Sequence, residues 1–355
     1  MSKKIILTGG GTAGHVNPNI ALLPALKSKD FEILYVGSYK GIERELIEKE
    51  GIPYKPISSG KLRRYFSIQN FIDPFKVIRG YFQAKKIIKN YKPDIVFSKG
   101  GFVSVPVVMA ASKKKVPVIC HESDLTPGLA NKLSMRYADR ICHTFPETAR
   151  FLNGKGVHTG SPIRDELKKG SKQKAVEVCG FTDEKPIILV VGGSLGAASI
   201  NKAIRDSLNE ILESYNIIHL CGKGKLDESL LNKNGYKQFE YVNEEMKDFL
   251  SASDLIISRA GSNAIWEFVF LSKPAILIPL PASSSRGDQL LNAKSFKKQG
   301  FSEVINEEDL TSELLLNTIQ TVYENREKYI EAMQSSGCGD AVNTITDLLI
   351  KASEK

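Results

Sequence analysis

Short apolar runs alternate with helix-like segments along the whole chain. In the first half, runs rich in β-branched residues predict strands at 4–8, 32–36, 94–98, 116–120 and 140–143. A second series follows at 186–191, 216–220, 254–258 and 275–279. Helical patterns, such as the one over 262–272, separate the runs. This βαβ rhythm is typical of a parallel sheet with helices on both faces. Because it occurs twice, it predicts an α/β protein with two doubly wound, Rossmann-like domains.

The boundary between the two series is expected near Gly160-Ser161-Pro162. A lysine-rich polar stretch, 168–174, follows there before the next strand. We therefore expect an N-terminal domain over 1–163 and a C-terminal domain over 164–340, with a final segment over 341–355. No apolar run approaches the roughly 18 residues that a membrane-spanning helix needs.

Glycine clusters stand where several strands are expected to end. They lie at Gly9–Gly11, Gly100-Gly101, Gly192-Gly193 and Gly261. Ligands of open parallel sheets bind at the carboxyl ends of the strands. A glycine turn lets a phosphate approach the backbone, and the N–H groups of the following helix favour its negative charge. Any one cluster could serve only as a tight turn. Four clusters in two similar halves indicate a ligand that contains a diphosphate.

The first cluster, continued to Gly14, matches the GxGxxG pattern of dinucleotide-binding enzymes. Such an enzyme also needs an acidic residue at the end of the second strand, where it holds the ribose. That strand ends in Gly37-Ser38, and the nearest acid, Glu32, begins it. No GxxxxGK[ST] segment is present either. The sequence therefore disfavours both a dehydrogenase and a P-loop NTPase.

Charge is distributed unevenly along the chain, whose formal net charge is +9. Up to Arg164 there are 27 Lys and Arg against 12 Asp and Glu, whereas the remainder has 22 against 28. This asymmetry favours a polyanion or an anionic membrane as a partner of the first half. The five cysteines include no CxxC pair, which argues against a zinc site or a disulfide framework and fits a reducing compartment.

The basic excess is concentrated in residues 61–92, which contain nine Lys or Arg and one acid, Asp73. Asp73-Pro74 predicts the N-cap and first residue of a helix. The helical spacing predicts one stripe of Phe71, Phe75, Ile78 and Tyr81, which could face either a membrane or the core. The core face would consist of Val77, Phe82, Ile87 and Ile88. Cations beside an aromatic stripe suit an interfacial helix on an anionic membrane, although most amphipathic helices simply pack on a core. No motif that reads nucleic acid is present, so nucleic acid is not an expected partner.

Seven segments resemble those of the peptidoglycan N-acetylglucosaminyltransferases, in the same order. They are GGGTAGHVNP, KGGFVSVP, HES, GSPIR, GGSLGA, SRAGSNAIWE and GDQLLNA, between residue 5 and about residue 293. The resemblance implies the GT-B fold, in which two Rossmann-like domains face each other across a cleft and 341–355 packs back on the first. It implies a peripheral protein at the cytoplasmic face of the cell membrane. Its reaction would move N-acetylglucosamine (GlcNAc) from UDP-GlcNAc, with inversion, to the muramyl 4-hydroxyl of lipid I, giving lipid II for peptidoglycan.

Two alternative functions remain compatible with the same residues. They are another GT-B enzyme, such as a UDP-GlcNAc 2-epimerase or a glycolipid synthase, and a sugar-nucleotide sensor or membrane scaffold without turnover.

The resemblance also implies roles for individual residues. Glu267 would accept hydrogen bonds from both ribose hydroxyls, and Gln289 would contact the GlcNAc hydroxyls. Asp124, where the family often has asparagine, would contact a sugar hydroxyl as an acceptor only. The other residues expected at the donor or in the cleft are Thr12, Ala13, Gly14, Arg164, Ser194, Val242, Arg259 and Ser262.

The chain contains no DxD motif, so neither a metal ion nor another cofactor is expected. Helix N-termini, backbone amides and Arg259 would then stabilise the charge of the departing UDP. A hydroxyl that attacks the anomeric carbon needs a general base. His15, which opens the helix after the first glycine turn, is the first candidate, with a cap or a phosphate donor as its alternative. Glu122 is the second candidate, with a supporting role as its alternative.

Overall fold

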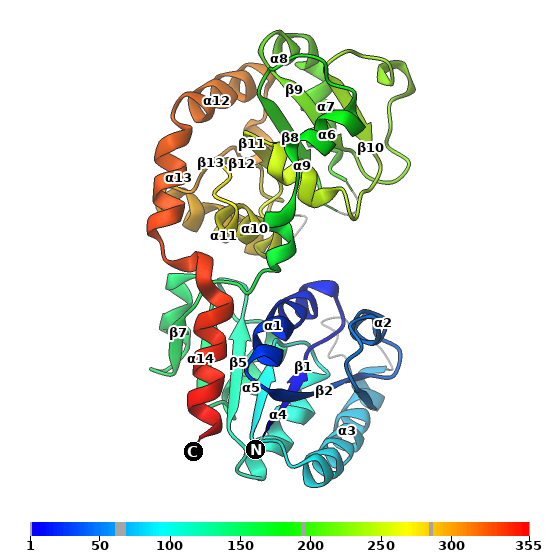
Figure 1. Ribbon diagram of the computed structural model, residues 1–355, viewed down its shortest axis with the longest axis vertical. Helices are drawn as coiled ribbons and strands as arrows, with labels where there is room; N and C mark the ends of the chain where they lie inside the picture. Colours follow the sequence, from blue (N-terminus) through cyan, green and yellow to red (C-terminus); the bar gives the residue numbers. More distant parts are fainter. Residues whose placement is uncertain (1, 61–68, 194–195, 284–286, 355) are drawn as a thin grey trace. The chain divides into compact units, whose positions relative to one another are not determined.

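The computed structural model describes residues 2–60, 69–193, 196–283 and 287–354. The chain forms two compact units (Figure 1). Unit 1 comprises Met1–Arg164 and Asp340–Lys355, and unit 2 comprises Asp165–Gly339. Each unit is built on its own parallel sheet. The predicted α/β fold with two doubly wound domains is confirmed. Among the described residues, no helix combines the length and apolar character needed to cross a bilayer.

Unit 1 contains a seven-stranded parallel sheet in the order β3-β2-β1-β4-β5-β6-β7. The strands are β1 (Lys3–Thr8), β2 (Phe31–Ser38), β3 (Tyr54–Ile57), β4 (Ile95–Ser98), β5 (Val118–Glu122), β6 (Arg140–His143) and β7 (Gly156–His158). The helices are α1 (Asn17–Ser28), α2 (Ile42–Lys49), α3 (Gln69–Tyr91), α4 (Ser104–Lys113), α5 (Leu129–Met135) and α14 (Ala341–Ser353).

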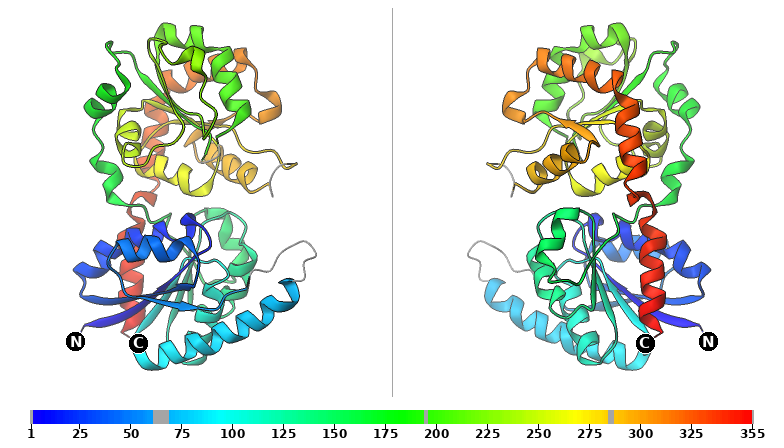
Figure 2. Two further views of the ribbon diagram at one scale, coloured as in Figure 1. Left: turned by 90° about the vertical axis from the view of Figure 1, so that its right-hand side faces the viewer. Right: turned by 90° about the vertical axis from the view of Figure 1, so that its left-hand side faces the viewer.

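Both faces of this sheet are buried, which is why its central strands are continuous apolar runs. Alternate residues of β1 point to opposite faces: Ile5 joins the core with α1 and α14, and Ile6 joins the core with α3 and α4. The last helix, α14, lies along unit 1 (Figure 2) and buries Ile345 and Leu349 completely in that core. The chain therefore returns to its first unit after completing the second.

Unit 2 contains a six-stranded parallel sheet in the order β10-β9-β8-β11-β12-β13. The strands are β8 (Ile187–Val191), β9 (Asn216–Leu220), β10 (Tyr236–Phe239), β11 (Leu255–Ser258), β12 (Ala275–Leu277) and β13 (Ser302–Val304). The helices are α6 (Lys172–Cys179), α7 (Ala198–Asp206), α8 (Leu208–Ser214), α9 (Met246–Ala252), α10 (Ser262–Phe270), α11 (Asp288–Lys298), α12 (Ser312–Glu324) and α13 (Arg326–Ser335).

The apolar residues of α3 are arranged differently from the prediction. Phe75, Ile78 and Phe82 are 73%, 54% and 61% exposed, whereas Tyr81 is half-buried and packs on the core. The predicted membrane stripe is thus wrong at Tyr81, and Phe82 is exposed rather than part of the core face. Residues 75, 78 and 82 follow helical spacing on one face, while Tyr81 shares a face with Ala84 that packs against α4. The side chain of Phe71 lies outside the described residues.

The start of α3 also differs from the prediction. The helix already includes Gln69, so Asp73-Pro74 lies inside it rather than at its N-terminus. Asp73 is buried and pairs with Lys76 Nζ at 3.0 Å instead of forming an N-cap. Pro74 is only the sixth residue of α3, so its missing N–H and the crowding of its ring affect only the first turns of the helix.

Candidate functional site

The first glycine turn follows β1 and leads into a short 3₁₀ helix, η1 (Ala13–His15). Gly11 has a φ of +90°, which a residue with a side chain rarely adopts. A carboxylate lies behind the turn: Gly11 N donates to Glu43 Oε2 at 3.2 Å, and Ser38 N donates to Glu43 Oε1 at 3.0 Å. A Cβ on Gly10 would lie only 2.5 Å from Glu43 Oε1. Glu43, which the sequence pattern did not single out, therefore fixes this turn and occupies one of its N–H groups.

His15 ends η1 and is half-buried at the same turn, next to Thr12, Ala13 and Gly14. Its Nδ1 lies 3.0 Å from Thr12 Oγ1. Burial, followed by the positive charge of Lys99, lowers the pKa of His15 to about 4, against an opposing effect of Glu43. The imidazole is therefore neutral at pH 7, which is the state a general base requires.

Glu122 ends β5 and is buried. Its carboxylate accepts hydrogen bonds from Asp124 N at 2.9 Å, Gly128 N at 3.2 Å and Asn131 Nδ2 at 2.8 Å. These contacts hold the loop between β5 and α5. Burial and the charge of Asp124 raise the pKa of Glu122. The carboxylate is thus engaged with its own loop, an arrangement that favours the supporting role over that of the base.

Lys99 directly follows β4 and is almost fully buried, at 1% exposure. Its Nζ contacts the Ser123 hydroxyl, and its charge acts on Glu122 and on the half-buried Asp124. Burial lowers the pKa of Lys99, while these two carboxylates oppose the change. Sequence reasoning missed this residue. The signal was present, because a lysine directly before a double glycine stands at a strand end.

The carboxyl ends of three neighbouring strands of unit 1, β1, β4 and β5, thus bring these groups together. The ammonium of Lys99 lies close enough to the imidazole of His15 and to the carboxylates of Glu122 and Asp124 for its charge to act on all three. His121, one residue before Glu122, is fully buried, and its Nε2 pairs with Gly160 O at 3.0 Å. His121 is therefore a structural histidine.

In unit 2, the corresponding strand ends are those of β8, β11 and β12, which are also neighbours. Ser194, in the turn after β8, lies outside the described residues. Gly261 is the N-cap of α10, and Ser262 and Glu267 belong to that helix, the first buried and the second half-buried. Gln289 lies in the first turn of α11, and its Oε1 accepts from Leu280 N at 3.0 Å.

Two predicted residues lie apart from these strand ends. Val242 is buried in the segment between β10 and α9, which follows an edge strand of the sheet. Arg164 is exposed and is the last residue of unit 1 before the chain enters unit 2.

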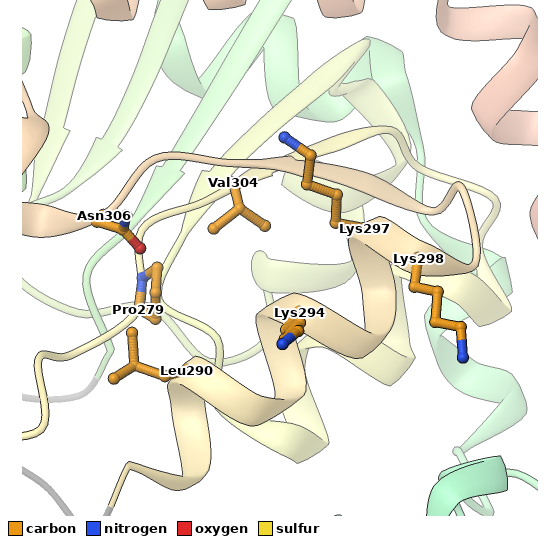
Figure 3. Close-up of a pocket in the computed structure, with 7 residues that line it drawn as sticks. All are labelled: Pro279, Leu290, Lys294, Lys297, Lys298, Val304 and Asn306. Carbon is orange, nitrogen blue, oxygen red and sulfur yellow. The ribbon is translucent and has the colours of Figure 1, made fainter.

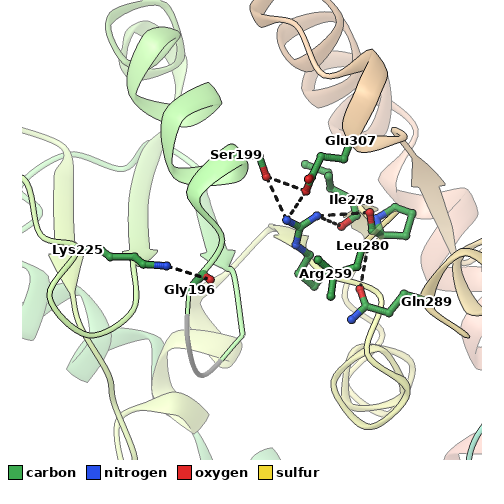
Figure 4. Close-up of polar contacts among 9 residues, drawn as sticks. Gly196, Ser199, Lys225, Arg259, Ile278, Leu280, Gln289 and Glu307 are labelled. Atoms are coloured by element: carbon green, nitrogen blue, oxygen red, sulfur yellow. Dashed lines mark hydrogen bonds and ion pairs between the residues drawn. The ribbon is translucent and has the colours of Figure 1, made fainter. Parts of the chain in front are cut away.

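Arg259 follows β11 and is 9% exposed, and both terminal nitrogens of its guanidinium contact other groups of the protein (Figure 4). Its Nη1 donates to Ile278 O at 3.1 Å and to Pro279 O at 3.4 Å. Its Nη2 donates to Ser199 Oγ at 3.1 Å and forms an ion pair with Glu307. Sequence reasoning placed Arg259 against the donor diphosphate. In the structure its guanidinium contacts four groups of the protein.

A cavity of about 530 Å³ opens elsewhere in unit 2, beside α11 (Figure 3). It is lined by Pro279, Leu290, Lys294, Lys297, Lys298, Val304 and Asn306. Lys297 and Lys298 point in different directions in Figure 3, and Lys297 Nζ pairs with Glu303 at 2.8 Å. None of the predicted site residues lines this cavity. Among the described residues, no three His, Cys, Asp or Glu side chains form a group that could hold a metal ion.

The chain matches two family models, the N-terminal domain of glycosyltransferase family 28 over residues 5–143 and its C-terminal domain over residues 187–348. It is 60% identical to a Clostridium botulinum protein, over 98% of this chain and 99% of the other. That protein is named UDP-N-acetylglucosamine–N-acetylmuramyl-(pentapeptide) pyrophosphoryl-undecaprenol N-acetylglucosamine transferase.

Solved structures agree with this similarity. A crystal structure of MurG from Acinetobacter baumannii superposes with a TM-score of 0.76 at 27% identity, over 98% of this chain and 99% of the other. A UDP-GlcNAc 2-epimerase from Neisseria meningitidis gives a TM-score of 0.69 at 14% identity, over 99% and 100% of the two chains. At that identity, the likeness to the epimerase concerns the fold alone.

Proposed function

This chain belongs to glycosyltransferase family 28, and from that premise we propose that it transfers GlcNAc from UDP-GlcNAc to the muramyl 4-hydroxyl of lipid I. The observation that carries the proposal is the 60% identity, over almost the full length of both chains, with the clostridial transferase. The name of that protein states the donor sugar and the lipid-linked acceptor. The product is lipid II, the precursor of peptidoglycan. Cell shape and cell division depend on this reaction through the wall it builds.

The reaction is a single displacement at the anomeric carbon of GlcNAc. The acceptor 4-hydroxyl oxygen forms the new bond to that carbon, the bond to the β-phosphate oxygen breaks with inversion, and UDP leaves with the electron pair. The hydroxyl proton passes to His15. Burial and the charge of Lys99 keep this imidazole neutral, so it is ready to accept the proton at pH 7.

The remaining groups of unit 1 support this step. Lys99 interacts with the charges of Glu122 and Asp124 and offsets them inside the protein. Glu122 holds the loop that carries Asp124, and Asp124 accepts a hydrogen bond from an acceptor hydroxyl. Thr12, Ala13 and Gly14 border the sugar and phosphates at the first turn.

Unit 2 binds the donor. Glu267 accepts from the two ribose hydroxyls, Gln289 contacts the GlcNAc hydroxyls, and Val242 presents its backbone to the uracil. The N-terminus of α10 at Ser262 directs its N–H groups at the diphosphate. Ser194 also contacts the diphosphate, and Arg164 lies near the nucleotide. Helix N-termini and backbone amides stabilise the departing UDP, so the reaction needs no metal ion or other cofactor.

A surface of α3 attaches the protein to the cytoplasmic face of the cell membrane, where the acceptor is held by its lipid. This α3 apolar surface consists of Phe75, Ile78 and Phe82. Exposed cations of the same helix surround it at Arg79, Lys85, Lys86 and Lys89. Apolar side chains that enter the interface, flanked by cations that attract anionic headgroups, are the two components of peripheral binding.

The test is a transfer assay with purified protein, labelled UDP-GlcNAc and lipid I in detergent. We expect lipid II and UDP in equal amounts, and no consumption of UDP-GlcNAc when lipid I is omitted. Epimerisation of UDP-GlcNAc without acceptor would identify an epimerase instead. Binding of UDP-GlcNAc without turnover under all conditions would identify a sensor.

A further inference from the structure

We propose that Glu307 is a positioning residue for the donor site and acts through Arg259. In this proposal Arg259 holds other groups of the protein in place and is not a direct ligand of the diphosphate. The inference deepens the proposed function, on which it rests, because it concerns the UDP-GlcNAc site of unit 2. Glu307 begins the short 3₁₀ helix η5 (Glu307–Asp309), beyond the last strand of the sheet.

Three side chains form a closed set of contacts, the Arg259 cluster, which consists of Arg259, Ser199 and Glu307 (Figure 4). Arg259 Nη2 donates to Ser199 Oγ at 3.1 Å, and Ser199 Oγ donates to Glu307 Oε2 at 2.8 Å. The ion pair between Arg259 Nη2 and Glu307 Oε2 closes the set. The three residues come from segments about 50 to 110 positions apart in the chain, so only the fold brings them together.

Burial makes this set costly to open. The side chains of Arg259 and Glu307 are only 10% and 25% exposed. A cation in this environment needs a counter-charge, and removing one partner of such a pair leaves the other uncompensated. The second arm of the guanidinium is equally engaged, with the carbonyls of Ile278 and Pro279. A phosphate that bound Arg259 directly would have to displace a carboxylate that is already in place.

The cluster instead determines where the donor-binding elements lie. Ser199 is the second residue of α7, the nine-residue helix that follows the glycine turn after β8. The N–H groups in the first turn of a helix have no partner within it and can bind phosphate. The contacts of Ser199 with Arg259 and Glu307 therefore hold this helix end in position. They fix the end that a diphosphate in the glycine turn would approach.

A second connection runs from Arg259 to Gln289. The guanidinium holds the carbonyls of Ile278 and Pro279, and the next residue, Leu280, donates its N–H to Gln289 Oε1. Gln289 is the residue assigned to the GlcNAc hydroxyls. Through one buried cation, Glu307 thus influences both the diphosphate end and the sugar end of the proposed donor site.

The experiment compares Glu307→Gln with the matched control Glu308→Gln. Both changes remove one negative charge from η5, but Glu308 is exposed. The dissociation constant of UDP is measured by calorimetry on the full chain without acceptor, and the donor KM and kcat are measured with lipid I. For Glu307→Gln we expect UDP dissociation constant and donor KM to rise about five- to tenfold with a much smaller change in kcat, because one charge-assisted contact is lost. Glu308→Gln should stay within about twofold of the wild type.

Two further variants keep the test decisive. Ser199→Ala removes two bonds of the cluster without changing its charge and should weaken UDP binding about twofold or more. Glu307→Asp, which keeps the charge on a shorter side chain, should give an intermediate value. If Glu307→Gln does not fold, unchanged UDP binding by Ser199→Ala overturns the proposal.

The outcomes separate this inference from the proposed function. Tighter UDP binding by Glu307→Gln would mean that Glu307 competes with the diphosphate for Arg259, which overturns the positioning role. A lower melting temperature with unchanged UDP binding would leave only a structural role and would also overturn it. A wild-type protein that binds no UDP would refute the proposed donor site itself.

Discussion

The α3 apolar surface gives a quantitative prediction for membrane binding through the substitution Phe75→Ala. Phe75 is the most exposed member of that surface, at 73%. A phenylalanine presents roughly 200 Å², so roughly 145 Å² of Phe75 is available to a membrane. At 25 cal/mol per Å², full burial of this area would contribute about 3.6 kcal/mol.

An interfacial helix buries only part of its apolar face, so we take about half of this value, roughly 1.8 kcal/mol. The alanine methyl group recovers roughly 0.4 kcal/mol of this, which leaves a loss of about 1.4 kcal/mol. The partition coefficient of Phe75→Ala on vesicles should therefore fall about tenfold.

The assay is sedimentation with vesicles that contain phosphatidylglycerol, at low and high salt, with neutral phosphatidylcholine vesicles for comparison. Phe151→Ala is the matched control, because Phe151 is 40% exposed in the same unit but outside α3. We expect the control to bind like the wild type, and binding of all proteins to weaken with salt because the flanking cations contribute. Equal binding by the two variants, or equal binding to anionic and neutral vesicles, would refute the assignment of this surface.

Four other properties can be measured directly. His15→Ala should lower kcat about 10²- to 10⁴-fold with little change in UDP binding, and a loss below tenfold would remove His15 as the base. Because the pKa of His15 is lowered to about 4, kcat/KM of the wild type should fall only as pH drops through about 4 and the base becomes protonated. An acid limb at pH 6.5 would contradict this environment. Leu349→Ala, in the fully buried part of α14, should lower the free energy of unfolding of unit 1 by about 2 to 5 kcal/mol in urea titrations. Lys351→Ala, exposed on the same helix, should be near neutral. EDTA should leave the transfer rate unchanged, and a loss that magnesium restores would contradict the metal-free mechanism.

The sequence by itself determined the central strands of both sheets. Strands such as β1 and β8 are buried on both faces of their sheets. They are therefore continuous apolar runs, which the hydrophobic pattern of the sequence shows directly. The four strands that the pattern did not predict, β3, β7, β10 and β13, are the outermost strands of the two sheets. They are three or four residues long and only partly buried, and therefore carry no distinctive run.

The glycine clusters and the motif residues could likewise be located in the sequence, because they follow strand ends at fixed spacing. The contacts between distant residues could not be assigned from the sequence, even where the residue itself stands in a motif, as Lys99 does. Glu43 behind the first turn, Lys99 beside Glu122 and Glu307 beside Arg259 act across chain separations that no local pattern records. Burial gives these charges their effect, and burial is a property of the folded chain.

The orientation of α3 was decided in the same way. Apolar residues occur on both sides of this helix, so the spacing allowed either Tyr81 or Phe82 to face outward. Tertiary packing against α4 buries the side that carries Tyr81 and leaves Phe82 in solvent. Periodicity determines which residues share a helix face, whereas only the neighbouring helix determines which face becomes the core.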